Sequence, residues 1–104
     1  MVLFVTMYNI HPDKREAFFK WSESALKRML AVPGVVEFRA YLPITGAYQV
    51  VTTIEFADLA AWASYNRNEE IQKVITELHA LALNVNHELW GPNSVIPAPI
   101  RPGK

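Results

Sequence analysis

The chain begins with nine mostly apolar residues, Val2–Ile10, which are rich in β-branched and aromatic side chains. Such a run predicts a β-strand, and its near-continuous apolarity indicates that both of its faces are buried. Alternate residues of a strand point to opposite faces of a sheet. Helices on one face can therefore shelter only one of the two apolar sets, which are Leu3, Val5 and Met7 on one side and Phe4, Tyr8 and Ile10 on the other.

The rest of the sequence alternates between helical and extended patterns. His11-Pro12-Asp13 begins a helix that runs to about Leu30, because proline suits the first helical position, and Val32-Pro33-Gly34 ends it. Asp58 is a good cap for a short helix that Asn66-Arg67-Asn68 breaks. The other expected elements are strands at 35–42 and 48–56, a longer helix from Ile71 to Val85 with apolar residues at helical spacing, and a short last strand at 87–91.

This order, β-α-β-β-α-β, predicts an α+β, ferredoxin-like fold. It consists of a four-stranded antiparallel sheet with two helices on one face. The uncovered face also carries Val35, Tyr41 and Val51, which makes a large apolar patch for a monomer. Burying five or six such side chains contributes about 1.5–3 kcal/mol each. We therefore expect a homodimer that stacks sheet against sheet, and the alternative is a monomer with an apolar sheet face.

Composition limits the possible partners and compartments. The 104 residues fit one domain, which we expect at 1–91, followed by a proline-rich extended arm at 92–104. Ten basic and ten acidic residues give no net charge, so neither nucleic acid nor an anionic membrane is expected as a partner. The first strand is too short to span a bilayer and lacks the features of a signal peptide. We expect a cytoplasmic protein.

Four stretches resemble the antibiotic-biosynthesis-monooxygenase (ABM)-like domains of the dimeric α+β barrel superfamily. They are Tyr8-Asn9-Ile10 with the helix start 11–16, the helix exit Val32-Pro33-Gly34-Val35, the junction Glu55-Phe56-Ala57-Asp58-Leu59-Ala60-Ala61-Trp62, and the second helix with its short last strand. The resemblance implies that two sheets form a barrel at the dimer interface. It also implies a ligand cavity between each sheet and its own helices. In the family's cofactor-free oxygenases, an electron-rich phenolic substrate reacts there directly with dioxygen.

Three residues are candidates for chemistry in such a cavity. Asn9 ends an apolar strand, where a buried amide needs partners, and it matches a position where related oxygenases carry asparagine. His79 borders the apolar stripe of the long helix, where a histidine of near-neutral pKa can act as a general base. Tyr65 offers a hydroxyl at the cavity mouth. The structural alternatives are an asparagine bonded to local backbone, a half-exposed histidine and an ordinary core tyrosine.

Aromatic residues are candidates for the cavity wall. Trp62 lies on the short helix and Trp21 on the first helix, and tryptophan combines aromatic bulk with one hydrogen-bond donor. Tyr8 and Phe18, from the first strand and first helix, complete the predicted substrate-binding set. The alternative is that each of them is an ordinary core residue, which is the more frequent role of a tryptophan on an apolar helix face.

No cofactor or metal is expected. The position that resembles the haem-ligating histidine of haem-degrading relatives is Ile75, which cannot ligate iron. His79 and His87 lack the helical spacing of a metal site, and the chain has no cysteine. The resemblance thus implies a cofactor-independent monooxygenase-like enzyme for a small aromatic or phenolic molecule. The alternative is a non-catalytic dimeric module that binds a small apolar ligand.

Overall fold

The computed structural model describes residues 1–103. Its elements are the strand β1 (Val2–Ile10), a 3₁₀ turn (Pro12–Lys14), the helix α1 (Arg15–Leu30), the strands β2 (Val35–Tyr41) and β3 (Val50–Phe56), the helices α2 (Leu59–Arg67) and α3 (Glu69–Leu81), and the strand β4 (Ala82–Trp90). None of these helices is long and apolar enough to cross a membrane.

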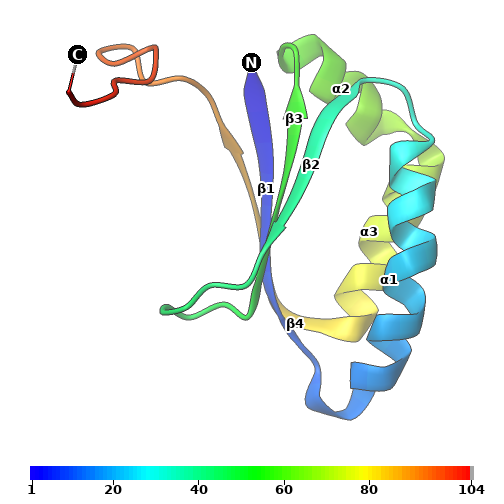
Figure 1. Cartoon of the computed structure of the whole chain (residues 1–104). Helices are drawn as coiled ribbons and strands as arrows, with labels where there is room; N and C mark the ends of the chain where they lie inside the picture. The colour runs from blue at the N-terminus through cyan, green and yellow to red at the C-terminus, as the bar shows by residue number, and fades with distance from the viewer. Residues whose placement is uncertain (104) are drawn as a thin grey trace.

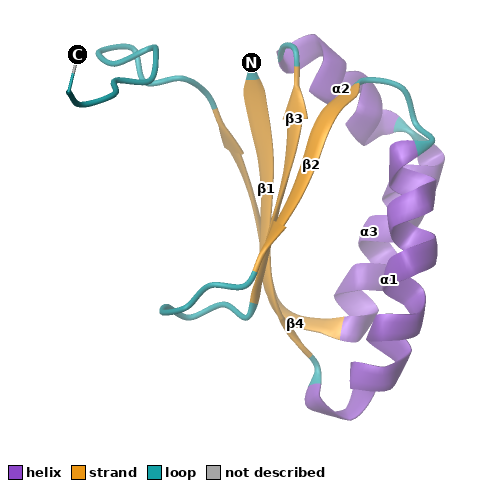
Figure 2. Ribbon diagram, viewed as in Figure 1, coloured by secondary structure: helices purple, strands orange, loops and turns teal. Residues whose placement is uncertain are grey.

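Within residues 1–103 the strands form one antiparallel sheet in the order β2-β3-β1-β4. The three helices all lie on one side of it, as Figures 1 and 2 show. This arrangement confirms the predicted ferredoxin-like fold. The two central strands, β1 and β3, are paired from Val2↔Phe56 to Tyr8↔Val50, so they supply most of the surface on which the helices pack.

The helix-facing side of β1 carries Phe4, Thr6, Tyr8 and Ile10, all of which are buried. This resolves the choice between the two apolar sets. Two clusters of buried side chains form the core along this side, one around Phe56 and Tyr65 and the other around Tyr8 and Phe18. The first cluster lies under α2 and the second between α1 and α3. Apolar contacts therefore hold the helices on the sheet at both of its ends.

Asn68 separates the two helices after β3, as the sequence predicts. Its side-chain oxygen accepts hydrogen bonds from the backbone N–H groups of Glu70 (2.8 Å) and Ile71 (3.3 Å), which would otherwise lack partners at the start of α3. Asp58 caps α2 in the same way through the N–H of Ala61 (2.8 Å). The bend between the helices brings Tyr65 and Ile71 into one cluster.

The predicted end of the second helix is wrong. The helix stops at Leu81 instead of reaching Val85, and β4 begins at Ala82 instead of residue 87. Asn84 adopts a positive φ of 56°, which asparagine tolerates better than most residues, and the pairing with β1 shifts register between Met7 and Asn9. An extended, bulged strand therefore replaces the last predicted helical turn.

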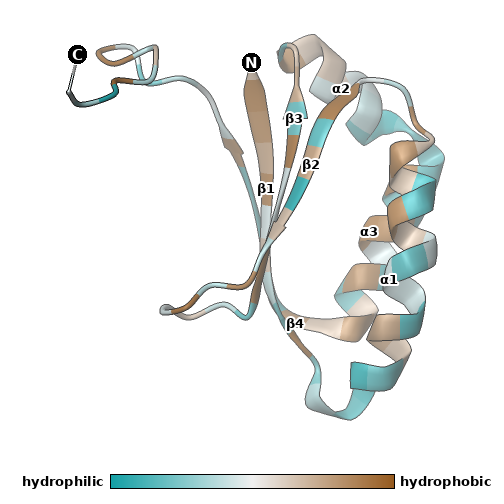
Figure 3. Cartoon of the chain, viewed as in Figure 1, coloured by the Kyte–Doolittle hydropathy of each residue, from teal (hydrophilic) through white to brown (hydrophobic). Residues whose placement is uncertain are grey.

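The other side of the sheet has no helix over it (Figure 1). It is partly polar, because Glu37, Arg39, Thr53 and Glu55 lie on it beside apolar residues. Figure 3 shows hydrophobic colour along β1 and hydrophilic segments on β2 and β3. Val5, on this side, is already fully buried within the chain, whereas Tyr41 and Trp90 are about half exposed. The β2–β3 connection and the segment after β4 both project toward this side (Figure 1), and they carry the exposed apolar residues Leu42, Ile44, Val95, Ile96 and Ile100.

Candidate functional site

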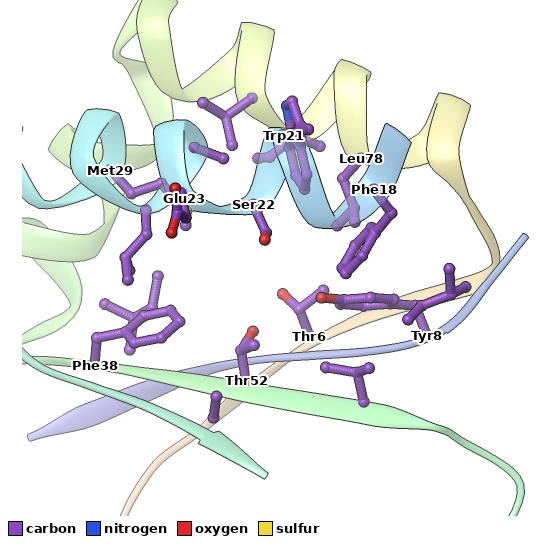
Figure 4. Close-up of a pocket in the computed structure, with 18 of the residues that line it drawn as sticks. Thr6, Tyr8, Phe18, Trp21, Ser22, Glu23, Met29, Phe38, Thr52 and Leu78 are labelled. Carbon is purple, nitrogen blue, oxygen red and sulfur yellow. The ribbon is translucent and has the colours of Figure 1, made fainter. Parts of the chain in front are cut away.

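A cavity of about 660 Å³ lies between the sheet and the helices. Its walls are mostly apolar and come from β1, β2, β3, α1 and α3, with Tyr65 from α2 and His87 from β4. Figure 4 shows Tyr8 and Phe18 on one side of this space and Phe38 and Met29 on the other. Phe19, Glu23 and Leu42 also line it and are exposed, so the cavity opens to solvent between α1 and the edge strand β2. This size suits a small organic molecule.

Besides Tyr65, four residues with hydroxyl groups interrupt the apolar lining. Thr6, Tyr8 and Thr52 extend from the sheet and Ser22 from α1, and Figure 4 shows their oxygens in the space between the two layers. Thr6 is buried, and its Oγ1 lies 3.0 Å from Nδ1 of His87. A few polar groups in an apolar cavity fix the orientation of a ligand.

His87 connects this polar group to the surface. Its ring stacks on Phe4, with centroids 5.4 Å apart and planes 8° from parallel, and its Nε2 lies 3.2 Å from Nε2 of the exposed His79. Burial, with a smaller contribution from the charge of His79, lowers the pKa of His87 below the ordinary histidine value. His87 is therefore neutral at pH 7 and able to accept a proton.

Tyr65 lies at the inner end of the cavity. Its side chain is 2% exposed, it packs on Phe56 with centroids 5.0 Å apart, and burial raises its pKa to about 12. The hydroxyl of Tyr65 and the indole N–H of Trp62 are both buried without a hydrogen-bond partner among residues 1–103. A buried unpaired donor costs about 1–3 kcal/mol. A ligand oxygen that reached the Tyr65 hydroxyl would remove that cost.

Trp21 forms part of the cavity wall, and a hydrogen bond to α3 fixes the position of its side chain. Its Nε1 donates a hydrogen bond to Glu77 (2.7 Å), which also accepts two hydrogen bonds from Arg28 (2.6 and 3.1 Å). The hydrogen bond from Arg28, followed by that from Trp21, lowers the pKa of Glu77. These contacts join α1 to α3 and fix the spacing between the two helices over the cavity.

The predicted site residues divide into two groups. Tyr65, Tyr8, Phe18 and Trp21 line the cavity. Asn9, His79 and Trp62 do not belong to its lining. Asn9 instead accepts a hydrogen bond from the backbone N–H of Gln49 (2.8 Å), which ties the start of β3 to the end of β1. Trp62 packs on Phe4, with centroids 6.1 Å apart.

Sequence reasoning gave no weight to Thr6 and little to His87. The signal for Thr6 was its position between Phe4 and Tyr8 on one face of an apolar strand. His87 was harder to recognise from the sequence, because the last strand was expected to begin with it. In the structure it lies in the second half of β4, opposite Thr6. The pairing of β4 with β1 therefore determines the polar part of the site.

The lining offers few ligands for a metal or haem iron. Within residues 1–103 there is no group of three or more histidine and acidic side chains arranged to hold a metal ion. Ile75, at the position that resembles a haem-ligating histidine, faces the cavity with an aliphatic side chain.

Comparison with known families gives one clear result. The model of the antibiotic biosynthesis monooxygenase family matches residues 1–77, which include β1, α1, β2, β3, α2 and most of α3. No curated protein sequence matches the chain.

Many solved structures share the fold at low identity. A ferredoxin-like dabb family protein from Mesorhizobium loti is 20% identical, with a TM-score of 0.77 over 89% of this chain and 97% of that one. A putative antibiotic biosynthesis monooxygenase from Nitrosomonas europaea is 13% identical, with a TM-score of 0.70 over 88% and 97% of the two chains. A dimeric ferredoxin-like protein of unknown function from Thermobifida fusca is 8% identical, with a TM-score of 0.70 over 86% and 88%.

Proposed function

Because the chain belongs to the antibiotic biosynthesis monooxygenase family, we propose that it is a cofactor-independent monooxygenase that oxidises a small phenolic aromatic molecule with dioxygen. The substrate lies in the cavity between the sheet and the helices. Tyr8, Phe18 and Trp21 contact its rings. Tyr65, which borders the cavity, must turn its buried and unpaired hydroxyl toward the substrate to donate a hydrogen bond to one of its oxygens. We propose the cytoplasm as its location.

The observation that carries this proposal is the contact between Thr6 and His87 at the wall of an otherwise apolar cavity. A charged phenolate is unfavourable in an apolar cavity, because it loses its contact with water. The proton of the substrate hydroxyl must therefore pass to a defined acceptor in the cavity wall. In the proposed step, the substrate hydroxyl donates to Thr6 Oγ1 while the Thr6 hydroxyl donates to His87 Nδ1. His87 Nε2–H then passes a proton to Nε2 of His79, which is exposed.

The substrate supplies all the electrons of the reaction. In the enol tautomer of an anthrone-type substrate, loss of the hydroxyl proton leaves negative charge on the ring-flanked carbon, which is CH₂ in the keto form and CH in the enolate, and dioxygen adds to that carbon. The resulting peroxide anion takes up the returned proton to form a hydroperoxide. The hydroperoxide then loses its remaining C–H hydrogen and its outer OH as water, so that one oxygen atom becomes a carbonyl and the other leaves in water. The two hydrogens of the CH₂ group and one O₂ are consumed, and no external reductant is needed.

Oxygen uptake tests this proposal. We expect the protein to consume dioxygen in aerobic buffer with anthrone-type phenols or hydroquinones, and Thr6→Val to slow that uptake by at least tenfold because it breaks the proton path. Asn9→Ala, which changes a residue outside the cavity lining, should retain the rate of the original protein. Uptake no faster than in buffer for the whole panel would contradict an oxygenase. Tryptophan quenching by the same compounds without uptake would instead support the binding-module alternative.

We also propose that two copies associate through the uncovered sheet face. Leu3, Tyr41, Val51 and Trp90 line a shallow hollow of about 380 Å³ on that face. The exposed apolar residues of the two projecting segments lie on the same side and would extend over a second copy. The dimeric relative from Thermobifida fusca supports this assembly.

Val51→Lys should dissociate this dimer. Val51 pairs with Met7 on one side and Tyr41 on the other, so a lysine there places an unpaired charge at the centre of the buried face. In sedimentation equilibrium at micromolar concentration, we expect twice 11.8 kDa for the original chain and 11.8 kDa for the variant. Lys27→Glu, on the helix-covered side, is the matched charge control. An original chain that already sediments at 11.8 kDa would contradict the dimer.

A further inference from the structure

The turn from α3 into β4 brings two histidines together that are eight residues apart in sequence. His79 lies near the end of α3, and His87 lies on β4 after the chain has reversed. Their Nε2 atoms are 3.2 Å apart, their ring centroids are 5.4 Å apart and the ring planes are inclined by 37°. The rings therefore meet edge to edge with their Nε2 atoms facing each other.

The structure holds one of these two rings firmly. His87 is fixed by the stacking contact with Phe4 and by the hydrogen bond between its Nδ1 and Thr6 Oγ1. Histidines that bind metal ions typically engage their second ring nitrogen in such a hydrogen bond. In the tautomer that binds a metal, His87 Nδ1–H donates to Thr6 Oγ1 and Nε2 is free to ligate, whereas the proton path proposed above uses the other tautomer. His79 is exposed, so its ring can adjust to a ligand without disturbing the core.

We propose that His79 and His87 form a two-histidine binding site for a divalent first-row transition-metal ion. Zinc–nitrogen bonds are about 2.0–2.1 Å long, and at a tetrahedral angle they place the two nitrogens about 3.3 Å apart. The observed distance of 3.2 Å between the two Nε2 atoms is close to this value, and a small rotation of the His79 ring would remove the difference. Imidazole nitrogens prefer Cu²⁺ and Zn²⁺ over harder ions, and Cu²⁺ binds more tightly than Zn²⁺.

Water completes the coordination sphere of this site. Among residues 1–103 no third histidine or acidic side chain joins the pair in a metal-holding group. The affinity is consequently lower than that of a structural zinc site with four protein ligands. The site does not depend on the proposed oxygenase activity, because ion binding can be measured without any substrate.

Calorimetric titration of the full chain with zinc chloride and with copper(II) chloride at pH 7.5 tests the proposal. We expect one ion bound per chain, and a loss of affinity of at least tenfold in both His79→Gln and His87→Gln. His11→Gln is the matched control, since His11 instead accepts a hydrogen bond from the N–H of Asp13 through its Nδ1. This variant should bind like the original chain. Electron paramagnetic resonance of the copper complex should show coupling to two imidazole nitrogens.

Two outcomes would overturn the proposal. One is the absence of saturable binding by either ion, and the other is binding that survives both His79→Gln and His87→Gln. Because His79 is exposed, its variant should fold normally, which circular dichroism without metal can establish. Failure of this test leaves the oxygen-uptake result unaffected, so the two proposals are judged separately.

Discussion

His87→Asn should lower the rate of oxygen uptake by roughly 10²- to 10⁴-fold, the range that a positioned general base contributes. Asparagine retains a group near the position of Nδ1 that can hydrogen-bond Thr6, but it has no nitrogen that accepts a proton at neutral pH. The loss should fall on kcat and leave KM nearly unchanged, because the apolar walls that bind the substrate remain in place. Stopped-flow and steady-state oxygen uptake with the same phenol would measure both constants.

The pH dependence of kcat/KM is a second, independent test of His87 as the base. Burial lowers the pKa of His87, so its neutral, basic form persists below the ordinary histidine value of about 6.5. We expect the acidic limb of kcat/KM to lie below that pH in the original chain and to be absent from His87→Asn. A limb unchanged by the substitution, or a rate within threefold of the original, would assign the base to another group. His11→Gln, which leaves the cavity intact, controls for the change of a histidine.

The first half of the chain was predictable because its signals are local. The bounds of β1 match the expected strand, and α1 ends at Leu30 as its sequence pattern indicates. Pro12 and the Val32-Pro33-Gly34 segment restrict the backbone at either end of that helix, so its length follows from single residues. The break at Asn68 is similarly local, since its side chain caps the next helix.

The α3–β4 boundary was not predictable in the same way. Leu78, Leu81, Ala82 and Val85 continue a helical spacing, but an alternation of apolar and polar residues overlaps it from Leu83 onward. Hydrogen bonding to β1, a partner about eighty residues away, decides between the two patterns, and no local propensity contains that information. The same pairing places His87 opposite Thr6. The polar part of the site was therefore missed for the same reason as the strand.

The aromatic part of the site was easier to predict because bulky residues at helix and strand spacing must face the sheet–helix interface. Tyr8, Phe18 and Trp21 lie there for that reason. The same reasoning could not separate Tyr65 from Trp62, which are three residues apart on one helix. Only the packing of α2 on the sheet determines that Tyr65 borders the cavity while Trp62 packs against Phe4.

Phe56→Ala should destabilise the protein by about 3–5 kcal/mol, the cost of truncating a large aromatic side chain in a core. Phe56 is completely buried, and it packs on Tyr65 and beside the backbone of Gly34. Because Phe56 lies on β3 and these neighbours belong to α2 and the α1–β2 connection, the space left behind cannot be closed by the movement of a single side chain. A domain of this size has roughly 5–15 kcal/mol of total stability, so the variant should lose a large part of it.

Urea unfolding followed by circular dichroism, at one fixed protein concentration, measures this loss. Leu59→Ala is the matched control, since Leu59 is 57% exposed and its truncation should change stability by no more than about 0.5 kcal/mol. Phe56→Leu should fall between the two, because leucine fills part of the space. The cavity should also respond, because Tyr65 loses the ring that holds it in place and its hydroxyl becomes less well positioned. A Phe56→Ala variant as stable as Leu59→Ala would mean that this cluster does not hold α2 on the sheet.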